Sequence, residues 1–150
     1  MTTDTRPKLT GVTFGKTPEG GTYQMLGMAK GAAMIGPKLA TMLGLIITDA
    51  AITPDDAQRL LHQAADLTFN CVSVDGHMST NDTVLLLANG AAGEEPLAGK
   101  DLEAFESALK NACDVLAHEI ADDGEGATHV IRIEVTGAES REDARKVARA

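Results

Sequence analysis

The sequence is poor in aromatic residues, in cysteine and in basic residues. Its 150 residues include no Trp, one Tyr, three Phe and two Cys. Two cysteines are too few for a disulfide framework, so we expect Cys71 and Cys113 to be small buried hydrophobic residues. The 13 Lys and Arg are outnumbered by 22 Asp and Glu, giving a formal net charge of −9. This acidity argues against a nucleic-acid ligand and against an anionic membrane surface.

Long apolar runs are also missing. No run reaches the roughly 20 residues of a transmembrane helix. The first residues, Met-Thr-Thr-Asp-Thr-Arg, lack the basic and apolar regions of a signal peptide, so we expect a cytoplasmic protein. No metal site is expected, because no metal-binding spacing with either cysteine is found among His62, His77, His118 and His129.

Short β-type segments and longer helical segments follow one another irregularly along the chain. Strands are predicted at residues 9–14, 22–26, 42–47, 71–74 and 129–135, with a hairpin turn at 17–21. Helices are predicted at residues 53–65, 82–88, 100–121 and 140–150. The order lacks regular βαβ units, so we expect a single α+β domain with helices packed on a sheet.

Two helices carry the clearest signals. Thr53 can cap the first, Pro54 suits its first position, and the next two aspartates favour the positive end of the helix dipole. The second has an apolar stripe at intervals of three and four residues: Leu102, Phe105, Leu109, Ala112, Cys113, Leu116 and Ile120. Ser140 and Asp143 can form a capping box for a last helix.

A glycine-rich stretch from Gly27 to Gly36 leads to Ala40-Thr41 and then to the apolar segment 42–47. Thr at this junction is ordinarily the first residue of a strand. However, cleavage after Ala40 would leave Thr41 as an N-terminal residue. Its hydroxyl would then be a nucleophile, with its own α-amine as the base.

Four sequence strings, in this order, resemble the ornithine acetyltransferase family, the glutamate N-acetyltransferases of arginine biosynthesis. They are Thr2-Thr-Asp-Thr5; Gly27-Met-Ala-Lys-Gly31 with Ala40-Thr-Met-Leu43 and Ile47-Thr-Asp-Ala50; Val74-Asp-Gly76 with Ser79-Thr-Asn-Asp-Thr83; and Asp122-Asp-Gly-Glu-Gly-Ala-Thr128. The resemblance implies a layered αββα sandwich like that of N-terminal-nucleophile hydrolases.

The resemblance also implies an activity. The chain would cut itself at Ala40-Thr41, so that residues 1–40 end an α chain and residues 41–150 begin a β chain. The two chains would form a heterodimer that can associate further. Thr41 would take the acetyl group from N-acetylornithine and pass it to glutamate. No cofactor is needed, and the sequence leaves open whether acetyl-CoA serves as a second donor.

Three substrate-binding residues follow from the resemblance in addition to Thr41. Lys30, eleven residues before Thr41, would bind a carboxylate. Glu125 would bind an amino group. Thr2 is the threonine that we expect to contact substrate, and the sequence leaves open whether Thr3 does so instead. The family's oxyanion-hole Thr-Gly pair and its C-terminal ligand contacts have no counterpart in these 150 residues. Two alternatives therefore stay open: an N-terminal-threonine amidohydrolase or aminopeptidase, and a non-catalytic chain that needs a complementary chain.

Overall fold

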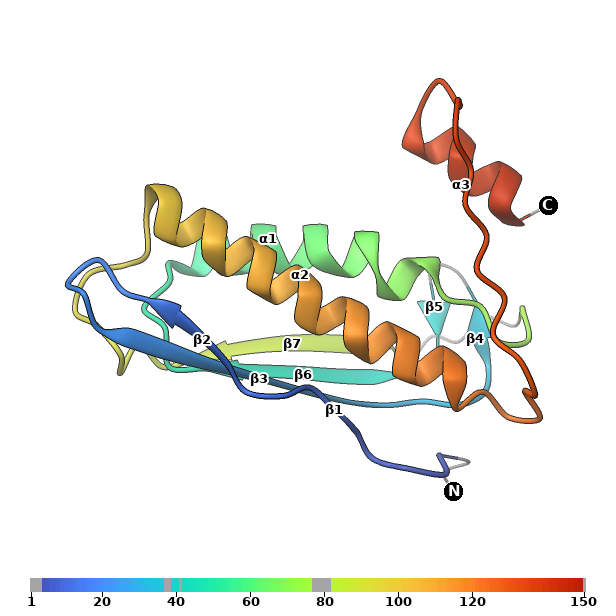
Figure 1. The fold of residues 1–150 in the computed structure, drawn as a ribbon, viewed down its shortest axis with the longest axis horizontal. Coiled ribbons are helices and arrows are strands. Elements are labelled where there is room, and N and C mark those ends of the chain that lie inside the picture. Colours follow the sequence, from blue (N-terminus) through green and yellow to red (C-terminus); the bar gives the residue numbers. More distant parts are fainter. Residues whose placement is uncertain (1–3, 37–38, 41, 77–81, 150) are drawn as a thin grey trace.

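The body of the protein is one sheet with two long helices packed on one of its faces (Figure 1). The computed structural model describes residues 4–36, 39–40, 42–76 and 82–149. The five-stranded sheet is formed by β1 (Lys8–Leu9), β2 (Thr13–Lys16), β3 (Thr22–Lys30), β6 (Leu43–Thr48) and β7 (Thr83–Ala88). The helices on it are α1 (Pro54–Leu67) and α2 (Gly99–Asp122). None of the described helices is long and apolar enough to span a membrane.

The centre of the sheet is the antiparallel pair β3–β6. β3 alternates, burying Tyr23 and Met25 against the helices, and it is longer than the predicted strand 22–26. The predicted hairpin before it is confirmed: the Thr17 N–H donates to the carbonyl of Gly21 at 3.0 Å, and Gly20 has a φ of 83° that favours glycine. The predicted strand 42–47 is confirmed as β6, but only one of its faces is buried, because Leu43 and Ile47 are exposed.

β7 corrects a prediction, because residues 82–88 were expected to be helical. They form a strand parallel to β6, in register from Leu43 opposite Thr83 to Thr48 opposite Ala88. A run of five apolar residues, Val84 to Ala88, is compatible with either a helix or a strand, so the pattern alone does not distinguish them. α1 is the crossover connection that the parallel pair β6–β7 requires. Pairing with β6, rather than local sequence, therefore makes residues 83–88 a strand.

Two further predicted strands are wrong. A 3₁₀ turn, Phe69–Cys71, leads into residues 72–74. Among the described residues only Val74 of this segment bonds to a strand, donating its N–H to the Ile35 carbonyl at 2.8 Å. Residues 129–135 alternate as predicted, but within the described part of the chain no strand pairs with them, and Ile131 is 83% exposed. A strand pattern forms no ladder without a neighbour to accept its backbone hydrogen bonds.

The helix predictions for α1, α2 and the last helix are confirmed. The Thr53 hydroxyl accepts the N–H of Asp56 at 3.2 Å, which caps α1. The apolar stripe of α2 is buried in the core, where Phe105 lies against Tyr23 with ring centroids 5.6 Å apart. Ser140 caps α3 (Arg141–Arg149) by accepting the Asp143 N–H at 3.1 Å. Of the cysteines, Cys113 is buried as expected, whereas Cys71 is exposed and corrects that expectation.

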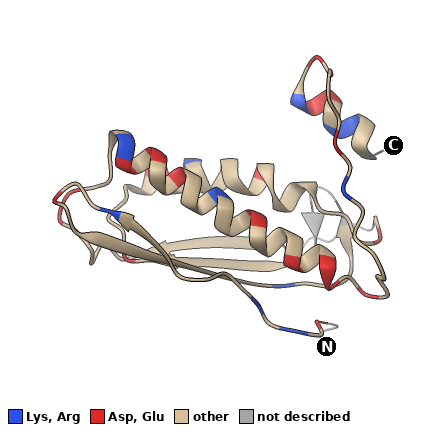
Figure 2. Ribbon diagram, viewed as in Figure 1, with Lys and Arg blue, Asp and Glu red and all other residues tan. Residues whose placement is uncertain are grey.

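The second face of the sheet is apolar and is not covered by the described elements. Its exposed large side chains are Leu9, Phe14, Leu43, Ile47, Leu85 and Leu87. Figure 2 shows that β6 and β7 carry no charged residues on either face. The expected α+β class is confirmed. Of the αββα sandwich that the resemblance implies, the described residues form one helix layer and one sheet layer.

A separate two-stranded sheet leads to the predicted cleavage position. β4 (Ile35–Gly36) pairs antiparallel with β5 (Leu39–Ala40), with Ile35 opposite Ala40. Met34, just before it, has a φ of 55°, which is uncommon for a residue with a side chain. Its N–H donates to the Asp75 carboxylate at 2.8 Å, which holds this turn.

Candidate active site

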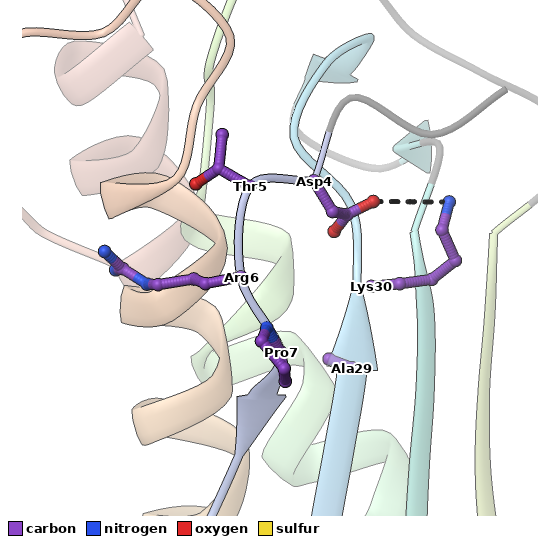
Figure 3. Close-up of a pocket in the computed structure, with 6 residues that line it drawn as sticks. All are labelled: Asp4, Thr5, Arg6, Pro7, Ala29 and Lys30. Carbon is purple, nitrogen blue, oxygen red and sulfur yellow. Dashed lines mark ion pairs between the residues drawn. The ribbon is translucent and has the colours of Figure 1, made fainter.

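The N-terminal segment Asp4–Pro7 contributes to two hollows, which share Thr5 and Arg6; Figure 3 shows the first of them. The first, of about 410 Å³, is lined by Asp4, Thr5, Arg6, Pro7, Ala29 and Lys30. The second, of about 420 Å³, is lined by Thr5, Arg6 and residues 122–127. Lys30 and Glu125, both predicted to bind substrate, thus line one hollow each.

A buried lysine fastens this segment to the end of α2. The Lys8 side chain is fully buried, and its Nζ lies 2.7 Å from Asp4 Oδ1 and 2.5 Å from Asp123 Oδ2. Thr5 also bonds Asp123, through its N–H at 3.0 Å and through its hydroxyl. The hydrogen bond from Lys8 and then that from Thr5 hold the pKa of Asp123 well below its ordinary value, so Asp123 is a carboxylate at neutral pH.

Asp4 connects the buried lysine to the end of β3. Its Oδ1 accepts the Gly31 N–H at 2.7 Å in addition to Lys8, while its Oδ2 lies 3.7 Å from Lys30 Nζ, as Figure 3 shows. Burial favours the neutral acid, but the hydrogen bonds from Lys8 and Gly31 and the charges of both lysines together lower the pKa of Asp4. Gly31 has a φ of 151°, where a side chain would be strained.

Lys30 is the last residue of β3. Its side chain is 42% exposed, and 3.7 Å is a long ion pair, so the ammonium is available to an anionic ligand. In the sheet register Lys30 lies opposite Leu43, the first residue of β6. The strand that follows the predicted nucleophile therefore begins beside Lys30.

Glu125 lies in the loop after α2, and this loop is joined to the turn after β3. The Glu125 N–H donates to the Ala32 carbonyl at 2.6 Å, while the Glu125 side chain is exposed. The structure thus joins the loop that carries Glu125 to the turn that directly follows Lys30, although the two are distant in the sequence. A cation at the end of β3 and an anion on the adjoining loop suit a ligand that has both a carboxylate and an amino group.

The other predicted site residues are placed only in part. Thr2 and Thr41 lie outside the described residues, so their roles stay predictions. Ala40 lies in β5 opposite Ile35. On the other side of position 41, the Met42 N–H donates to Asp82 Oδ1 at 3.2 Å.

Sequence reasoning missed the ion cluster under this site. In the sequence, Asp4 and Asp123 stand out only as members of the family motifs, and Lys8 belongs to no motif. Nothing in the local sequence marks Lys8 as buried, because Asp123, its buried partner, comes from the far end of the chain, and Asp4, four residues away, does not by itself indicate burial. Arg6 was also missed: Figure 3 shows it directed to α2, where it pairs with Glu119 at 3.2 Å and Asp122 at 2.5 Å.

The family model of the ArgJ family matches residues 1–150. The arginine biosynthesis bifunctional protein ArgJ of Bifidobacterium longum is 49% identical over 150 residues, covering all of this chain and 36% of that protein. The mitochondrial ArgJ of Verticillium alfalfae is 48% identical over 151 residues, covering 98% of this chain and 32% of that protein.

The crystal structure of ArgJ from Bacillus halodurans is also similar. It is 45% identical with a TM-score of 0.51, covering 53% of this chain and 38% of that one. The chain therefore belongs to the ArgJ family, and the resemblance to the ornithine acetyltransferases is confirmed. It spans about a third of the length of the curated relatives it matches.

Proposed function

We propose that the protein is an acyltransferase of arginine biosynthesis that moves the acetyl group of N-acetylornithine to glutamate. Family membership supports this proposal, since the relatives are named arginine biosynthesis bifunctional proteins. The observation that carries it is the hydrogen bond that joins the Glu125 loop to Ala32, two residues after Lys30. This bond ties the Glu125 loop to the turn after Lys30, and it supports a scheme in which the cation binds a carboxylate and the anion binds an amine of the amino-acid substrates.

The first chemical step is self-cleavage. The Thr41 hydroxyl attacks the Ala40 carbonyl carbon, the amide C–N bond breaks, and residue 40 becomes esterified to the Thr41 oxygen. Water then hydrolyses the ester, which leaves a carboxylate on Ala40 and a free amine on Thr41. This amine has an ordinary pKa of about 8 and can take a proton from the hydroxyl at neutral pH.

The second step is acetyl transfer through a covalent intermediate. The Thr41 oxygen attacks the acetyl carbonyl of N-acetylornithine, and ornithine leaves after its amine takes the proton held by the Thr41 amine. The amine of glutamate then attacks the acetyl ester, and the bond from the acetyl carbon to the Thr41 oxygen breaks. A proton from the glutamate amine passes by way of the Thr41 amine to that oxygen, which releases N-acetylglutamate and restores the hydroxyl. In this scheme Lys30 binds a substrate carboxylate, Glu125 a substrate amine, and Thr2 contacts the substrate.

The test uses the natural gene product that carries this sequence. With N-acetylornithine and glutamate we expect ornithine and N-acetylglutamate in equal amounts, and intact-mass measurement should show two chains meeting between Ala40 and Thr41. Thr41→Ala should give one uncut chain without transfer, while Thr41→Ser, which keeps a hydroxyl, should retain part of both. Replacing N-acetylornithine by acetyl-CoA decides whether a second donor is used.

Two outcomes would overturn the proposal. Release of free acetate without N-acetylglutamate would favour the amidohydrolase alternative. An uncut wild-type chain that still transfers acetyl groups would exclude Thr41 as an N-terminal nucleophile.

A further inference from the structure

The buried ion cluster of Asp123, Lys8 and Asp4 lies directly behind the proposed substrate-binding lysine. Removing three charged groups from water is costly, and buried ion pairs are often no more stabilising than apolar side chains of similar size. Stability alone therefore does not account for this arrangement.

The cluster is a continuous line of contacts that ends at Lys30. From inside to outside the distances are 2.5 Å from Asp123 to Lys8, 2.7 Å from Lys8 to Asp4, and 3.7 Å from Asp4 to Lys30. The two inner side chains are buried, Asp4 is 15% exposed and Lys30 is 42% exposed. The inner three groups carry one net negative charge, which the Lys30 ammonium balances.

The Asp4 carboxylate is held in one orientation by its hydrogen bonds. Lys8 and the Gly31 N–H both bond Oδ1, which fixes the carboxylate and leaves Oδ2 on the side of Lys30. Because the Asp4–Lys30 pair is long, Asp4 sets the position of the ammonium without occupying it fully.

We propose that Asp4, held in place by Lys8 and Asp123, is a positioning residue that directs the Lys30 ammonium toward the carboxylate of the bound amino acid. This inference rests on the acetyl-transfer function proposed above. The cluster would affect substrate binding only through Lys30. Its effect on KM can therefore be measured separately from its effect on folding.

The test is a double-mutant cycle on the natural gene product, with kcat and KM for N-acetylornithine as readouts. Asp4→Asn keeps one oxygen that can accept from both Lys8 and Gly31, replaces the oxygen on the Lys30 side by an NH2 group, and removes the charge. We expect it to raise KM about 10-fold, with kcat changed less than about twofold, because it removes binding rather than chemistry. Asp123→Asn, one step further from Lys30, should raise KM about threefold. In a Lys30→Met background, Asp4→Asn should have no further effect on KM.

Controls separate positioning from folding. Arg59→Met removes an exposed ion pair on α1, 2.7 Å from Asp56, and should leave both constants unchanged. Ile46→Val lowers stability in the core by about 0.5–1.5 kcal/mol and should leave KM unchanged. If Asp4→Asn does not fold, the same cycle is run with Asp123→Asn.

Failure of the inference is distinct from failure of the function. If wild-type protein transfers acetyl groups but Asp4→Asn leaves KM unchanged, or acts equally with and without Lys30, the inference alone is overturned. If the wild-type protein transfers no acetyl groups, the proposed function is overturned. The same double-mutant cycle is then measured on the dissociation constant of N-acetylornithine by calorimetry. Additive effects there, or no binding at all, would overturn the inference too.

Discussion

Replacing Lys8 by methionine should destabilise the protein strongly at neutral pH. Met fills much of the lysine's volume but leaves the carboxylates of Asp4 and Asp123 buried without their shared cation. Both oxygens contact one nitrogen and so lie at most about 5 Å apart, where two unit charges at an effective dielectric constant of about 20 repel by at least about 3 kcal/mol. Breaking buried pairs typically costs about 3–5 kcal/mol, so we expect a loss in that range.

The pH dependence of this loss identifies its cause. In the wild type the pKa values of Asp4 and Asp123 are lowered on folding, from about 3.9 in the unfolded chain. Their contribution is therefore complete above about pH 5 and is lost as the pH falls below about 4. In Lys8→Met the same carboxylates lack a cation, their pKa values rise on folding, and protonation stabilises the variant. The stability difference should therefore shrink as the pH falls from about 7 to about 4.5.

The assay is urea unfolding of the natural gene product at several pH values. Lys146→Met is the matched control, because Lys146 forms an exposed pair with Asp143 at 3.2 Å, and its loss should stay below about 0.5 kcal/mol at every pH. A second variant, Lys8→Met with Asp123→Asn, should recover much of the loss by removing one of the two repelling charges. A loss below about 1 kcal/mol for Lys8→Met, or one independent of pH, would refute the reasoning.

Three further predictions test the cap, the thiols and the site. Thr53→Ala should cost about 1 kcal/mol of unfolding free energy, measured by urea unfolding, whereas Thr53→Ser should cost much less because it keeps the capping hydroxyl. In the native protein a thiol reagent should modify exposed Cys71 but not Cys113, whose pKa burial raises to about 12; equal labelling would contradict the core. Lys30→Met and Glu125→Gln should each raise KM for N-acetylornithine by about 10-fold or more, and unchanged values would remove both from the proposed site.

Local patterns predicted the elements whose signals are local. The cap at Thr53 and the stripe of α2 are properties of single helices, and the hairpin turn near Gly20 needs only neighbouring residues. β7 was missed because its strand character comes from pairing with β6 across the α1 crossover. For residues 129–135 the opposite error occurs, because a strand is predicted and none forms. They alternate as a strand does, but no described strand pairs with them.

The candidate site likewise has a part that the sequence predicts and a part that only the fold reveals. Family resemblance indicates Lys30 and Glu125, and the structure adds that the Glu125 loop is joined to the turn after Lys30, with the Glu125 N–H donating to the Ala32 carbonyl at 2.6 Å. The ion cluster was out of reach because Lys8 and Asp123 are separated by most of the chain. Burial of a lysine is decided by which carboxylates the fold brings to it, and no short motif records that. The placement of Thr2 and Thr41 remains a prediction.

The pairing of β3 with β6 determines what a cut between Ala40 and Thr41 would leave behind. Six residue pairs, from Met25 opposite Thr48 to Lys30 opposite Leu43, would then join two separate polypeptides within one sheet. The pieces would remain associated after the bond is broken and would separate only on denaturation. Reassembly would then be a bimolecular reaction, so the midpoint of reversible unfolding should rise with protein concentration in the cut form and stay constant in an uncut variant.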